Sequence, residues 1–107
     1  MTQPNADRVA LLTERLAMHD AHAIKLFRIA AEKAAAVRDH RAILEQNERE
    51  KTTMLGWSEI PDGARLTRLR DELEVHVQSL RRATDDWRQA ETIAKAAAQD
   101  LADATNA

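Results

Sequence analysis

The fold of this chain is decided by its one interruption, the stretch Gly56-Trp57-Ser58-Glu59-Ile60-Pro61-Asp62-Gly63. This stretch holds three of the four glycine and proline residues in the 107-residue sequence, and the fourth is Pro4. Glycine and proline commonly end regular elements, and neither occurs at residues 5–55 or 64–107. The sequence therefore predicts a helix at about residues 5–54, a loop at about 55–62 and a helix at about 63–105.

The composition favours long helices in a single domain over residues 1–107. The chain contains 21 alanines and only 3% aromatic residues, a composition typical of long helices. A β-sandwich or barrel would need a turn roughly every 8–12 residues, more turns than this chain can supply. Because cysteine is absent, the chain has no disulfide and no thiolate metal site, which fits the cytoplasmic localisation that we expect.

The apolar residues of each helix recur every seven positions. The second helix has one column with Leu66, Leu73, Leu80, Trp87, Ala94 and Leu101, and a companion column with Leu69, His76, Ala83, Ala90, Ala97 and Ala104. The first helix has Val9, Leu16, Ala23, Ala30, Val37 and Leu44, with the companions Leu12, His19, Leu26, Lys33, His40 and Asn47. These four columns, called the seam below, predict an all-α antiparallel coiled-coil hairpin.

The axial register of the two helices is left open by the repeat. If each column faces the other column of its partner, the numbers of paired residues add to either 113 or 120. We favour 120, which places Lys33 against Trp87 and lets both helices reach the loop with little overhang. The value of 113 would instead place Leu26 against Trp87.

Several polar residues on or beside the seam have two interpretations. Lys33 and Asn47 are either accommodated at its edge or fix its register. His40 and His76 fall in adjacent layers, on the order of 5 Å apart. Because two neighbouring charges on the seam are unfavourable, we expect the protein to lose thermal stability when both histidines are protonated below about pH 6.5. A metal site is the less favoured interpretation, because two histidines supply too few ligands for zinc. We expect no metal and no cofactor.

The sequence also argues against catalysis, nucleic acid and membranes. No activated nucleophile or glycine-rich phosphate loop is present, so we expect no enzyme. The 16 basic and 18 acidic residues are interspersed, without the basic excess of a nucleic-acid footprint. We expect no signal peptide, and no stretch approaches the roughly 20 apolar residues of a membrane span.

The first helix has more apolar residues than one partner helix can cover. The surplus, which we expect to be a self-association face, consists of Ile24, Phe27, Ile29, Ala31, Ala34 and Ile43. A wide apolar stripe requires more than one covering helix, so a homodimeric four-helix bundle is expected. The loop adds the large apolar residues Met54, Leu55, Trp57 and Ile60, which either close the hairpin end or bind a partner.

These features favour a non-enzymatic protein–protein interaction module, such as an adaptor, a chaperone-like protein, an inhibitor or a structural hairpin. It would bind another protein through the loop tip or the apolar helix face. Two alternatives remain at this point. One is a small metal- or ligand-binding helical bundle that uses histidines such as His19 and His22. The other is a nucleic-acid accessory protein that uses the arginines at residues 65–82.

Overall fold

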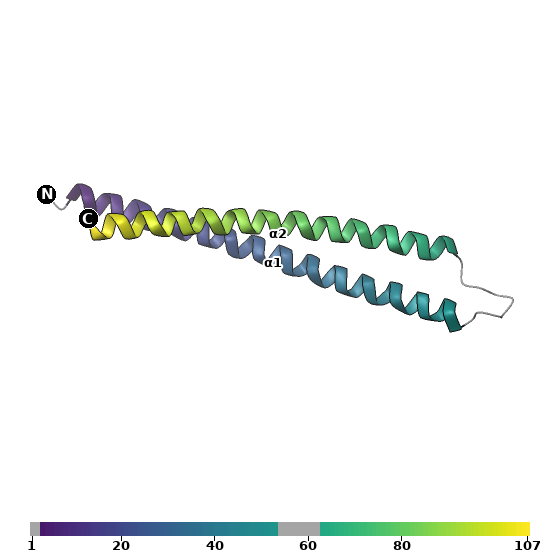
Figure 1. Ribbon diagram of the computed structural model, residues 1–107. Helices are drawn as coiled ribbons and strands as arrows, with labels where there is room; N and C mark the ends of the chain where they lie inside the picture. The colour runs from purple at the N-terminus through teal and green to yellow at the C-terminus, as the bar shows by residue number, and fades with distance from the viewer. Residues whose placement is uncertain (1–2, 54–62) are drawn as a thin grey trace. The chain divides into compact units, whose positions relative to one another are not determined.

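A computed structural model describes residues 3–53 and 63–107, and within these ranges it contains two long helices and no strand. Helix α1 spans Gln3–Thr53 and helix α2 spans Gly63–Asn106 (Figure 1). The all-α prediction is therefore confirmed, and each helix boundary lies within two residues of its expected position. Pro4 lies in the first turn of α1, where its missing N–H group would have no partner within the helix.

The contacts between α1 and α2 divide the chain into two compact units. Unit 1 combines the part of α1 up to Ala30 with Ala83–Ala107, and unit 2 is formed by Ala31–Arg82. In unit 1 the purple start of α1 lies beside the yellow end of α2, and in unit 2 the teal end of α1 lies beside the green start of α2 (Figure 1). Each unit thus pairs an early segment with a late one, as an antiparallel hairpin requires.

The core of unit 1 is built largely from alanine. Its buried residues are Leu12, Ala30, Ala83, Ala90, Ala94 and Ala104. The distance between packed helices depends on the side chains at the contact, so alanine allows α1 and α2 to approach closely. The last turn of α2 is closed by the backbone N–H of Ala107, which donates to the carbonyl oxygen of Asp103 at 3.1 Å.

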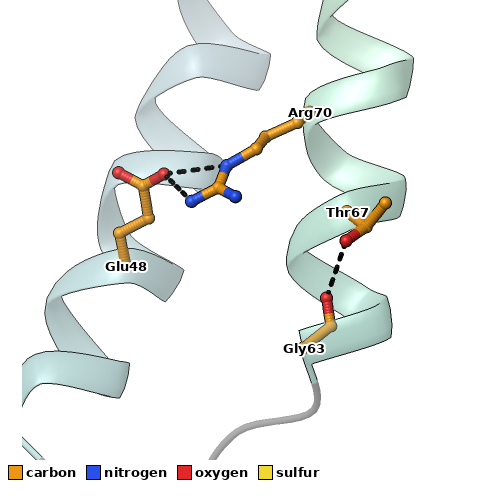
Figure 2. A network of polar contacts seen from close by, with 4 residues as sticks. All are labelled: Glu48, Gly63, Thr67 and Arg70. Carbon is orange, nitrogen blue, oxygen red and sulfur yellow. Dashed lines mark hydrogen bonds and ion pairs between the residues drawn. The ribbon is translucent and has the colours of Figure 1, made fainter.

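Unit 2 has a small core of larger side chains, with Val37, Leu44 and Leu66 buried. At its surface Arg70 donates from Nε and Nη2 to Oε1 of Glu48, at 3.3 and 3.0 Å (Figure 2). Both side chains are about half exposed, and exposed ion pairs contribute little to stability. The packing of the three apolar residues therefore holds this unit together more than its ion pair does.

The seam predicted from the seven-residue repeat is present in the structure. Every seam residue is buried or half-buried except Lys33, which is exposed. Asn47 is buried, but its Nδ2 donates to the carbonyl oxygen of Ile43 in its own helix, at 2.8 Å. This hydrogen bond lies entirely within α1, so it does not fix the position of α1 relative to α2.

The register differs from the one that we favoured. In unit 1 Trp87 contacts Phe27, with ring centroids 5.2 Å apart, so the pairing of Trp87 with Lys33 is wrong. The numbers of this aromatic pair add to 114, and those of His40 and His76 in unit 2 add to 116. Either register places His40 and His76 in adjacent layers, so their contact does not distinguish the two. Phe27 is the neighbour of Leu26, so its contact with Trp87 lies within one residue of the alternative pairing, in which the numbers add to 113.

None of the helices in the described part of the chain has a segment both long and apolar enough to span a lipid bilayer.

The alanine core of unit 1 can be tested by enlarging one residue. Ala90→Leu should lower the free energy of unfolding by about 1–3 kcal/mol, because Ala90 is only 4% exposed and the added atoms would force the helices apart. Ala96→Leu is the matched control, since Ala96 is exposed on the same helix. Urea unfolding followed by circular dichroism gives both values. Equal stability of the two variants would contradict close packing at Ala90.

Candidate functional site

Unit 1 has an open apolar groove of about 550 Å³ between α1 and α2. It is lined from α1 by Leu16, Asp20, Ala23, Ile24 and Phe27, and from α2 by Trp87, Glu91, Ala94, Lys95 and Ala98. Most of these residues are seam residues or their immediate neighbours. The edge of the seam is therefore accessible from outside in this groove.

An aromatic pair forms one wall of this groove. The rings of Phe27 and Trp87 meet edge to face, at an interplanar angle of 62°, which is a favourable arrangement for aromatic side chains. Trp87 is a half-buried seam residue, whereas Phe27 is 51% exposed. Ile24 lies one turn before Phe27 and is 53% exposed. Two large apolar side chains thus remain accessible beside a tryptophan that the hairpin covers only partly.

The charged residues around the groove differ in whether they are paired. On α2 the Nζ of Lys95 lies 3.0 Å from Oε1 of Glu91, so these two charges neutralise each other within the helix. On α1 Asp20 and Arg28 are exposed, and no hydrogen bond or ion pair joins either of them to another described residue. They lie four residues before and four residues after Ile24. The exposed apolar centre on α1 is therefore flanked by one unpaired charge of each sign.

Unit 2 contains a second polar cluster, centred on His40. Its Nε2 donates to the carbonyl oxygen of Leu69 on α2 at 2.9 Å, and lies 3.6 Å from Oε2 of Glu72. The ring centroid of His40 lies 5.1 Å from that of His76, which confirms the expected proximity of the two histidines. Glu72, one of the two carboxylates that the sequence offers near these histidines, is therefore the one that lies beside the His40 ring.

Within the described residues there is no group of three or more histidine, aspartate or glutamate side chains placed to hold a metal ion. The His40 ring instead joins the two helices, since its side chain is only 12% exposed and its bond crosses from α1 to α2. Its geometry is that of a structural contact.

The structure separates the residues that we expected to form the self-association face. Ile24 and Phe27 line the groove in unit 1, and Ala34 lines a smaller one in unit 2. Ala31 and Ile43 are exposed, whereas Ile29 is half-buried. The expected loop-tip residues Met54, Leu55, Trp57 and Ile60 lie outside the described residues.

Four exposed apolar residues were missed from the sequence. Leu11, Met18, Val75 and Ile93 are 47%, 71%, 68% and 51% exposed. All four lie outside the seam columns. A search of the sequence for large apolar residues that do not belong to the seven-residue repeat would therefore have identified them. The charged pair of Asp20 and Arg28 was also missed, because its significance depends on the exposure of Ile24 between them.

Comparison with known proteins gives no match to a protein-family model, to a curated protein or to a solved structure.

The structural role of His40 can be tested by truncation. His40→Ala should lower the free energy of unfolding by about 1–3 kcal/mol, because it removes a largely buried ring and its bond to Leu69. His22→Ala is the matched control, since His22 is exposed on the same helix and should change stability by less than about 0.5 kcal/mol. Thermal and urea unfolding at neutral pH give both values. A His40→Ala effect no larger than that of the control would exclude a structural role.

Proposed function

We propose that this protein is a non-enzymatic protein–protein interaction module, and that its first partner is a second copy of the chain in a four-helix bundle. The observation that carries this proposal is the exposed pair Ile24 and Phe27 beside the groove of unit 1. Burying a large apolar side chain stabilises an assembly by roughly 1.5–3 kcal/mol. A helix packed into the groove would cover both residues and the accessible edge of Trp87.

The polar groups of the chain support a structural rather than a catalytic use. The hydroxyl groups of Thr13, Thr67, Thr92 and Thr105 each donate to the carbonyl oxygen four residues earlier in their own helix. The His40 ring donates across the hairpin. Nucleophilic catalysis needs a nucleophile within hydrogen-bond reach of an oriented base. No hydrogen bond between the described side chains has that form.

The loop tip, Met54, Leu55, Trp57 and Ile60, is the second surface that we propose for a partner protein, on the strength of its large apolar residues. We place the module in the cytoplasm, because a chain without cysteine needs no oxidising compartment.

Sedimentation equilibrium tests the self-association directly. At micromolar concentration the species should have twice the 12.0 kDa mass of the chain. A monomer under these conditions would overturn the proposal of a second copy as the first partner.

Truncation of the exposed Phe27 side chain tests whether self-association uses the groove of unit 1. Phe27→Ala should weaken self-association by about tenfold or more, because it removes an aromatic anchor from the groove. Val75→Ala is the matched control, since Val75 is 68% exposed in unit 2 and away from this groove. Sedimentation over a dilution series measures both affinities, and thermal unfolding checks that each variant is folded. Equal weakening by the two substitutions would exclude the groove as the contact surface.

A further inference from the structure

We propose that two copies associate through an antiparallel pairing of their α1 helices about a two-fold axis at Ile24, in which Asp20 of each copy pairs with Arg28 of the other. This inference rests on the proposed self-association and specifies its geometry. It uses only residues of unit 1.

The starting point is the symmetry of the charges around Ile24. Asp20 and Arg28 lie four residues on either side of it, which is about 6 Å in each direction along the helix. Residues four apart in a helix lie on the same face, so Asp20, Ile24 and Arg28 form one short exposed stripe. The stripe has an acidic end, an apolar centre and a basic end.

An interface between identical copies related by a two-fold axis uses the same patch on both chains. When the axis passes through Ile24, the two helices run antiparallel and the two isoleucines meet at the centre. Each residue four positions before the axis then lies at the height of the residue four positions after it in the other copy. Asp20 therefore lies opposite Arg28 twice, once on each side of the axis.

The opposite orientation is unfavourable for the same residues. A parallel pairing of the two stripes would place Asp20 opposite Asp20 and Arg28 opposite Arg28. Like charges facing each other across an interface weaken it substantially. The charge pattern on α1 thus favours the antiparallel arrangement over the parallel one.

The groove explains where the apolar side chains of the second copy would lie. The exposed Ile24 and Phe27 line it together with the small residues Ala23 and Ala94. Alanines leave room for the larger side chains of an approaching helix. Because Glu91 and Lys95 already neutralise each other, they leave the charge of Asp20 available to the incoming arginine.

Charge reversal with rescue tests this arrangement. Asp20→Arg and Arg28→Asp should each weaken the dimer by about 100-fold or more, because each places two like-charged pairs in the interface. The double variant with both substitutions should restore the affinity to within about tenfold of the original, since it exchanges the two signs and recreates both pairs. Asp85→Arg is the matched control, because it makes the same charge change at an exposed position of α2 in unit 1 and should leave the affinity unchanged.

Sedimentation velocity over a dilution series gives the dissociation constants of the unmodified chain and the four variants, and circular dichroism verifies the helix content of each variant. Rescue by the double variant supports the pairing. Single reversals that act no more strongly than Asp85→Arg, or that the double variant fails to rescue, overturn the pairing while leaving self-association intact. A monomeric unmodified chain overturns both this inference and the proposed self-association.

Discussion

The structure depends on the packing of α1 against α2 along one narrow seam. Helices of 51 and 44 residues bury few side chains on their own, and most helical stability in proteins comes from packing of an apolar face. Here the face consists of residues that recur every seven positions, with alanine prominent in unit 1. Alanine allows close approach of the helices but contributes little apolar area per residue. The seam therefore holds the helices together without covering their flanks.

The narrow seam explains both the polar contacts and the exposed apolar residues. Polar groups near it are satisfied by backbone carbonyl oxygens, as with Asn47 within α1 and His40 across to α2. These groups consequently have structural partners. In contrast, Ile24 and Phe27 on the flank of α1 have no covering helix, and the groove beside them ends at the half-buried Trp87. This uncovered flank is the basis of the pairing with a second copy that we propose.

Much of the fold followed from the sequence, and less of the candidate site did. The two long helices and the membership of the seam are local properties of the chain, since they depend on the placement of glycine and proline and on the spacing of apolar residues. The surplus of apolar residues on α1 was also visible. The groove was not, because it depends on which residues of α2 lie beside Ile24 and Phe27. Asp20 and Arg28 could be recognised as part of the site only after the structure showed that Ile24, which lies between them, is exposed.

The sequence by itself determined two long helices and the residues of the seam, with Lys33 as the exception. Only the tertiary structure decided the register, which brought Phe27 to Trp87. The physical reason is that a slide of one heptad, about 10 Å, leaves the same columns on the seam and buries the same kinds of side chain. Apolar periodicity cannot distinguish such registers. The fit of individual rings and hydrogen bonds across the seam distinguishes them.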